Sequence, residues 1–218
     1  MRGKIIVFEG LDYSFKQTNS IKLYNYIKDN ITDKVIHLAF PNYDGACSKE
    51  IKYYLSGDVD YDAETIASYY FLNKKEMIEF CDIESKLNEG YYIIFDRYKL
   101  SNLAFQGTRA ENMNIFIDKI NNLYNKTPKE DFTIYMNMPV EISHELIKER
   151  DFKNGMSNDI HEENFNFKKK VENNYLYLLD KICSNKYAII NCIDNNNIKS
   201  EDIIFNNILN TLEDNNIL

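Results

Sequence analysis

The most informative stretch of the chain reads Phe8-Glu9-Gly10-Leu11-Asp12-Tyr13-Ser14-Phe15-Lys16-Gln17-Thr18. It overlaps the end of a short, β-branched apolar run, Lys4 to Phe8, which predicts a buried strand. The stretch is close to the pattern G-x-x-x-x-G-K-[ST], in which backbone N–H groups and a lysine hold phosphate groups. Gly10 and Lys16 occupy the first-glycine and lysine positions of that pattern. The motif therefore predicts a phosphate-binding loop between a strand and a helix.

Two positions depart from the pattern. Phe15 stands at the second glycine, and Gln17 stands at the hydroxyl position with Thr18 next to it. Glycine serves in such loops because its backbone reaches positive φ and can approach a phosphate without a Cβ. A bulky residue held at positive φ costs about 1–3 kcal/mol. Either the loop follows another path or it binds a triphosphate weakly. On the motif alone, an ordinary strand-to-helix turn with a solvent-facing Lys16 is a further alternative.

Apolar periodicity organises the remainder of the chain. Further strands are predicted at 35–40, 91–95, 132–138 and 187–191, and helices at 18–27, 51–55, 66–87, 115–123, 140–150, 165–182 and 203–212. Strands that alternate with helices of this length predict an α/β fold with a parallel sheet covered on both faces. Ligands of such sheets bind beyond the carboxyl ends of the strands, where Glu9-Gly10 and Asp96-Arg97 both lie. The Asn-rich segment 195–197 is expected to be a loop.

Composition excludes several classes of protein. A chain of 218 residues suffices for one α/β domain with a full core. The formal net charge of −8 argues against a nucleic-acid-binding surface, and the apolar runs are too short to cross a membrane. No signal peptide is recognised, so we expect a cytoplasmic protein. The four cysteines form no C-x-x-C pair and are expected to be buried, reduced thiols.

Residue by residue, the loop resembles the thymidylate kinase signature F-E-G-x-D-G-S-G-K-x-T, with Tyr13 and Phe15 in place of the two inner glycines. Other segments resemble the same family in the correct order. They are F-P-x-Y-D at 40–44, Y-L-x-G at 54–57, D-R-Y-x-x-S at 96–101, D-x-x-I-Y-L-x-x-P at 131–139 and D-I-H-E at 159–162.

The resemblance implies one P-loop NTPase domain spanning 1–218, a three-layer sandwich with a five-stranded parallel sheet and a lid segment. It places the phosphate loop at 9–18, the monophosphate-site segments at 40–57 and 71–106, and the lid at about 150–162. It also implies transfer of the ATP γ-phosphoryl group to dTMP with Mg²⁺, and a homodimer. A catalytically impaired relative that only binds nucleotides is the alternative, because Tyr13, Phe15 and Lys75 depart from the family within the site itself.

Roles for individual residues follow from the resemblance. Catalytic roles fall to Asp12, Lys16, Arg97 and Arg150. ATP binding falls to Gly10, Ser14, Lys16, Gln17 and Thr18, and the metal to Thr18 and Asp96. Substrate binding falls to Asp12, Phe40, Tyr43, Phe71, Lys75, Arg97, Ser101, Asn102, Gln106 and Tyr175.

Two of these assignments depend on an alignment with the family that can shift by one residue. Phe71 and Lys75 lie four apart on one helical face, where the family typically carries Phe and Arg, and a shift of one position would give Lys74 instead of Lys75. A core phenylalanine beside a solvated lysine is the structural alternative. Gln106 falls one place later than the family spacing.

Overall fold

The computed structural model describes residues 2–154, 164–184, 186–195 and 197–218, and for 149–154 it describes the backbone alone. Its centre is a five-stranded parallel sheet with the order β2-β3-β1-β4-β5. The strands are β1 (Lys4–Glu9), β2 (Val35–Ala39), β3 (Tyr92–Asp96), β4 (Phe132–Asn137) and β5 (Tyr187–Asn191). Each of them was predicted within one residue at either end. Phe8 lies in register with Asp96, so the carboxyl ends of β1 and β3 are side by side.

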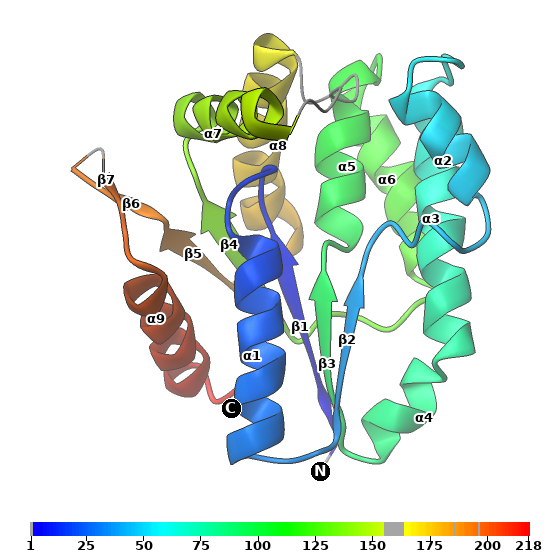
Figure 1. The fold of residues 1–218 in the computed structure, drawn as a ribbon. Helices are drawn as coiled ribbons and strands as arrows, with labels where there is room; N and C mark the ends of the chain where they lie inside the picture. Colours follow the sequence, from blue (N-terminus) through cyan, green and yellow to red (C-terminus); the bar gives the residue numbers. More distant parts are fainter. Residues whose placement is uncertain (1, 155–163, 185, 196) are drawn as a thin grey trace.

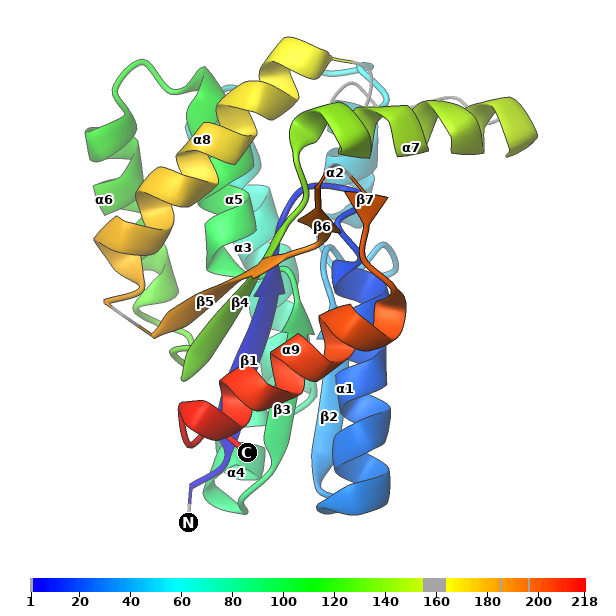
Figure 2. The ribbon, with the colours of Figure 1, turned by 90° about the vertical axis from the view of Figure 1, so that its left-hand side faces the viewer.

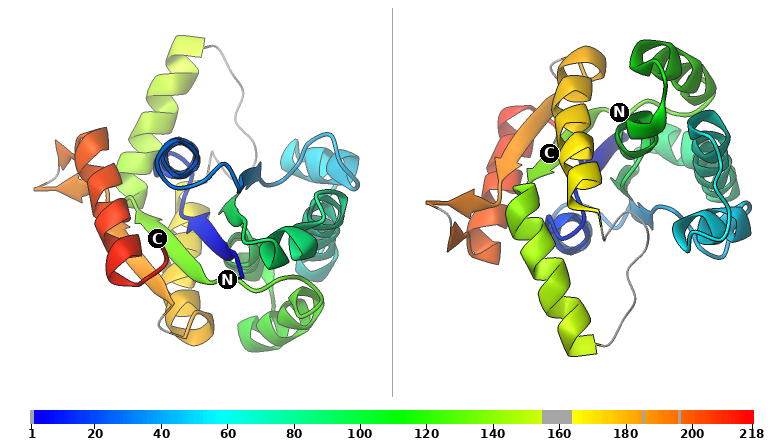
Figure 3. Two further views of the ribbon diagram at one scale, coloured as in Figure 1. Left: turned by 90° about the horizontal axis from the view of Figure 1, so that it is seen from below. Right: turned by 90° about the horizontal axis from the view of Figure 1, so that it is seen from above.

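Helices cover both faces of the sheet and give the three layers seen in Figures 1 and 2. Their bounds are α1 (Lys16–Asn30), α2 (Ser48–Leu55), α3 (Ala63–Phe80), α4 (Ile83–Asn88), α5 (Lys99–Gln106), α6 (Met113–Tyr124), α7 (Val140–Asn154), α8 (Phe165–Ile182) and α9 (Glu201–Asp214), with a 3₁₀ turn at Gly107–Arg109. In the views along the sheet, α1 and α9 lie on one side of it and α3, α5, α6 and α8 on the other (Figure 3).

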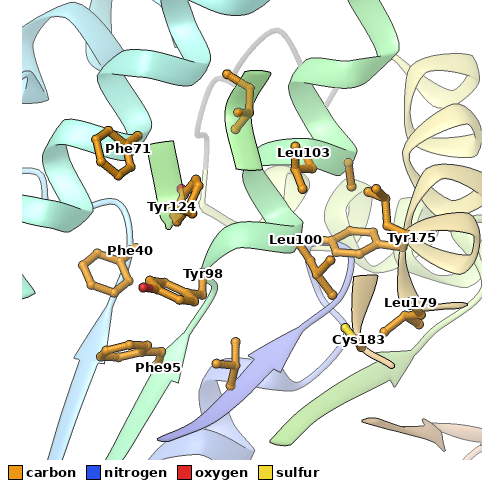
Figure 4. Packing of buried hydrophobic residues seen from close by; sticks show 14 of the residues in the cluster. Phe40, Phe71, Phe95, Tyr98, Leu100, Leu103, Tyr124, Tyr175, Leu179 and Cys183 are labelled. Atoms are coloured by element: carbon orange, nitrogen blue, oxygen red, sulfur yellow. The ribbon is translucent and has the colours of Figure 1, made fainter. Parts of the chain in front are cut away.

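Alternation along β1 divides the apolar core between these two faces. Ile5 and Val7 join the cluster under α3, α5, α6 and α8, whereas Ile6 and Phe8 join the cluster under α1 and α9. Figure 4 shows part of the first cluster, in which the rings of Phe95 and Tyr98 pack between Phe40 and Tyr124. Successive strand residues point to opposite faces, so these runs are apolar throughout because both faces are covered.

One local prediction was wrong, one helix was missed, and one loop was predicted only in part. The single helix expected at 66–87 is two helices, because the chain turns at Cys81 and Asp82, and Asp82 has a φ of 49°. Helix α5 was not predicted at all. Within the segment expected to be a loop, Asn197 pairs with Asp194 in a short antiparallel ladder of β6 (Ile193–Asp194) and β7 (Asn197–Ile198). Among the described residues, no helix is long and apolar enough to span a bilayer.

Candidate active site at the carboxyl edge of the sheet

The loop after β1 retains the backbone that glycine would supply. Gly10 has a φ of +147°, and a Cβ there would lie 2.8 Å from the carbonyl oxygen of Met136. Tyr13 and Phe15, at the two substituted glycine positions, have φ values of 59° and 62°. The substitutions have therefore not moved the chain out of the left-handed region, and α1 begins directly afterwards at Lys16.

Lys16 points back into this loop rather than into solvent. It is buried, its Nζ donates a hydrogen bond to the carbonyl of Leu11 at 3.0 Å, and it lies 3.7 Å from Oδ1 of Asp12. Burial lowers its pKa to about 8, as does the positive charge of Arg97, while Asp12 raises it. A buried lysine of this kind is a ready partner for an anion, and the alternative of a solvent-facing turn lysine is excluded.

Arg97 joins the loop to the end of β3. Its Nη1 donates to the carbonyl of Gly10 at 3.0 Å, and its Nη2 pairs with Oδ1 of Asp12. Burial on its own lowers the pKa of Arg97, but Asp12 leads the groups that raise it, and the net shift is upward. Asp12 therefore stands between two cations, Lys16 on the helix side and Arg97 on the strand side.

A cavity opens beside Asp12 and Arg97. Its lining residues come from the loop, the segment after β2, α2, α3, the end of β3 and α5: Asp12, Phe40, Pro41, Tyr43, Leu55, Tyr70, Lys74, Arg97, Ser101, Asn102, Phe105 and Gln106. Seven predicted substrate residues are among them, namely Asp12, Phe40, Tyr43, Arg97, Ser101, Asn102 and Gln106. The structure thus brings together segments that lie up to about ninety positions apart in the sequence.

Phe71 and Lys75 do not line this cavity. Phe71 is buried in the core, where its ring packs edge-on against Tyr124, and Lys75 pairs with Glu79 at 2.8 Å on another side of α3. The cavity instead receives Tyr70 and Lys74, one position earlier on the same helix. The cavity therefore receives the alternative Lys74 rather than the preferred Lys75, and Tyr70 rather than Phe71. The four-residue spacing of an aromatic and a basic residue holds for both pairs, so spacing alone did not distinguish them.

Tyr175 lies beneath the site as part of a buried network around Glu9. Oε1 of Glu9 accepts hydrogen bonds from the backbone N–H groups of Tyr98 and Ser101, at 2.8 and 3.2 Å. Its Oε2 accepts from the hydroxyl groups of Ser101 and Tyr175, the latter at 3.2 Å. Burial raises the pKa of Glu9, against the hydrogen bonds from Ser101 and Tyr98, which lower it.

Glu9, Tyr70 and Phe105 were not among the predicted site residues, and Lys74 was named only as the alternative to Lys75. For Glu9 a signal was available, because a carboxylate that ends a buried strand needs hydrogen-bond donors. The ring of Phe105 lies 5.2 Å from the guanidinium carbon of Arg97, on a helix that periodicity did not reveal.

The residues at the loop's edge suit a divalent cation. Asp96 is buried at the end of β3, and no group among the described residues hydrogen-bonds to its Oδ1. Gln17 and Thr18 are exposed in the first turn of α1. Magnesium is usually held by one or two carboxylates together with water and phosphate oxygens, which this sparse set of ligands fits. The side chain of Arg150 and most of the predicted lid at about 150–162 lie outside the described residues.

A parallel sheet with a lysine-bearing loop after its central strand, and an arginine-lined cavity beside that loop, defines a P-loop nucleoside monophosphate kinase. The thymidylate kinase family model matches residues 8–203. The chain belongs to the thymidylate kinase family.

Individual relatives agree with this assignment. A thymidylate kinase of Brachyspira hyodysenteriae is 30% identical over 100% of this chain and 97% of its own length. A thymidylate kinase of Plasmodium falciparum is 34% identical over 63% of each chain. The solved structure of thymidylate kinase from Candida albicans superimposes with a TM-score of 0.78, covering 99% of this chain and 93% of that one at 23% identity, which supports the fold.

Proposed function

We propose that this chain transfers the γ-phosphoryl group of ATP to dTMP and releases dTDP and ADP. The observation that carries the proposal is the row Lys16–Asp12–Arg97, which joins the phosphate loop to the cavity. In phosphoryl transfer the protein supplies positioning and charge neutralisation rather than covalent chemistry, and a row of two cations about one carboxylate supplies both.

The donor side is the loop 9–18. Its backbone N–H groups, with Gly10 and Ser14, form the cradle for the ATP phosphates at the start of α1, where the helix dipole also favours negative charge. Lys16 leaves its carbonyl partner on Leu11 for the β- and γ-phosphates. Thr18, Gln17 and, through water, Asp96 would hold Mg²⁺. When bound, the metal neutralises charge on the β- and γ-phosphates.

The acceptor side is the cavity. Arg97 and Lys74 orient the monophosphate of dTMP, and Asp12 lies near its sugar. Phe40, Tyr43 and Tyr70 supply aromatic surface for the base, and Asn102 and Gln106 supply polar groups at the same wall. An oxygen of the bound monophosphate then attacks the γ-phosphorus of ATP as the bond to ADP breaks. Arg150 stabilises the charge in transit, and the lid at about 150–162 excludes water.

The non-catalytic alternative finds no support in the geometry of the loop. Tyr13 and Phe15 keep the left-handed backbone of the positions they occupy, and neither of them lines the acceptor cavity. The proposal also includes the homodimer and the cytoplasmic location expected from the sequence.

The test is ADP formation in a coupled assay with purified protein, Mg·ATP and a panel of nucleoside monophosphates. We expect turnover that depends on dTMP and falls by two or more orders of magnitude in Arg97→Ala, since a desolvated charge contact is lost. Arg2→Ala is the matched control, because Arg2 pairs with Asp131 near the opposite edge of the sheet and should keep full activity. If the folded wild-type protein showed no turnover with any acceptor, the proposed kinase activity would be refuted.

A further inference from the structure

Lys74 carries its ammonium group into the acceptor cavity without a carboxylate partner. The residue is 2% exposed and projects from α3. Its Nζ donates one long hydrogen bond, 3.5 Å, to the carbonyl of Tyr70, and lies 5.6 and 5.2 Å from the ring centroids of Phe40 and Tyr70. Among the described residues, no carboxylate oxygen lies within 4.0 Å of it. Two ring faces and one carbonyl compensate poorly for the lost hydration of a buried cation.

The charged groups around Lys74 have largely opposing effects. Glu9, at the end of β1, favours its protonated form, and Arg97, at the end of β3, disfavours it. Asp12 in the loop is already shared by Lys16 and Arg97. The segment of α5 at the cavity contributes only neutral side chains, Ser101, Asn102, Phe105 and Gln106.

The remaining charges near α3 are used elsewhere. Glu76 accepts from the backbone N–H of Ala46, Lys75 pairs with Glu79, and Lys52 of α2 lies over the ring of Tyr43. Asp44 is exposed on the segment after β2. Burial is consequently the leading influence and lowers the pKa of Lys74 to about 7.

We propose that the acceptor monophosphate enters this cavity together with a proton, which the Nζ of Lys74 takes from solvent and keeps while the dianion is bound. The inference rests on the proposed function, because it deepens the role of the same acceptor site. A phosphate dianion supplies the counter-charge that the cavity lacks, so its arrival makes the ammonium form the favoured one. An arginine at this position could not behave in this way, since a guanidinium stays protonated at every physiological pH.

The direction of the pH dependence follows. The free site has a lowered pKa, so the fraction of Lys74 that is already charged falls as the pH rises above about 7. Each binding event then takes up more proton, and affinity for the dianion falls. From pH 7 to pH 8 the dissociation constant of dTMP should rise roughly fivefold, and proton uptake at pH 8 should approach about 0.9 per site. The phosphate itself, with its second pKa near 6, contributes almost nothing over this range.

The experiment is calorimetric titration of the full chain with dTMP, without ATP, at pH 8 in two buffers of different protonation enthalpy, Tris and HEPES. The slope of the observed enthalpy against buffer enthalpy gives the number of protons taken up. Wild type should show close to one proton, Lys74→Arg should bind with almost none, and Lys74→Met should bind at least tenfold more weakly with none. Lys75→Arg is the matched control one position along α3 and should behave as wild type.

The outcomes separate this inference from the function it rests on. Binding of dTMP by wild type with no proton uptake, or uptake that persists in Lys74→Arg, would overturn the inference and leave the acceptor assignment standing. No binding of dTMP by folded wild type would overturn both. The wild-type measurement decides the matter even if a variant misfolds.

Discussion

At the scale of single residues, the loop holds Tyr13 and Phe15 in left-handed backbone that costs about 1–3 kcal/mol at each bulky residue. Such conformations persist where the surroundings over-determine them. Here side chains from three other parts of the chain donate hydrogen bonds to loop carbonyls: Arg97 to Gly10, Ser143 to Asp12 and Cys192 to Ser14. In addition, Phe15 packs against the core cluster under α1, which offsets part of its strain.

This geometry predicts an unusual order of stability at position 13. Glycine ordinarily destabilises a folded chain relative to alanine, but at a φ of 59° alanine keeps the strain and glycine removes it. Tyr13→Gly should therefore be more stable than Tyr13→Ala by about 1 kcal/mol, or about 2–4 °C in Tm for a chain of this size. Thermal unfolding of the two variants measures it. An alanine variant as stable as the glycine variant would mean that residue 13 is not left-handed in solution.

The local sequence predicts this loop and its two anomalous residues, but it does not determine the backbone path of the loop. The motif contains Gly10 and Lys16 at the right spacing, and that spacing is local information. The choice of φ at Tyr13 and Phe15 depends on Arg97, Ser143 and Cys192, which no local pattern connects to the loop.

At the scale of elements, Glu9 explains why α5 escaped prediction. The helix begins after Tyr98, which makes no side-chain capping hydrogen bond of its own. Oε1 of Glu9 instead accepts from the backbone N–H groups of Tyr98 and Ser101, which are free donors of the first turn. A negative charge at a helix N-terminus also interacts favourably with the helix dipole. The side chain that caps the N-terminus of α5 thus lies on β1, about ninety residues away in the sequence.

Substitutions at Glu9 should separate its hydrogen-bonding role from its charge. Glu9→Gln retains one oxygen for the two backbone donors, and the hydroxyls of Ser101 and Tyr175 can turn to accept from the new amide, so a loss of about 1 kcal/mol or less is expected. Glu9→Ala leaves buried N–H groups without a partner and should cost about 3 kcal/mol. Urea unfolding of both variants gives the difference. Equal losses would show that the carboxylate charge, rather than its acceptor geometry, holds α5.

The break between α3 and α4 was missed for a different reason. Ile78, before the break, and Ile83 and Leu87, after it, all enter the same core cluster. Apolar periodicity therefore continues almost undisturbed through Asp82, although the backbone reverses its φ there. Periodicity reports which side chains are buried, and it is blind to a turn that keeps them on one face.

At the scale of the molecule, the order of the strands assembles the site. β1 lies between β3 and β4, so the ends Glu9-Gly10 and Asp96-Arg97 become neighbours although the sequence separates them. The alternation of strands and helices predicts that strand ends share one edge. It does not predict which strands are adjacent, and their order became known only from the structure.

The proposed homodimer can be tested on the apolar surface of α3. Leu72 and Phe80 are 45% and 84% exposed, so a two-fold contact through α3 would remove apolar side chains from water. In a two-fold dimer through α3, the same surface of both protomers forms the interface. A charged substitution in α3 would therefore place two like charges in that interface. Phe80→Glu should therefore convert a dimer to a monomer in light scattering coupled to gel filtration. Ile203→Glu is the matched control, because Ile203 is 52% exposed on α9, across the sheet from α3 (Figure 1), and should leave the mass unchanged. A wild-type monomer at micromolar concentration would refute the dimer, whereas a dimer that survives Phe80→Glu would place its interface on another face.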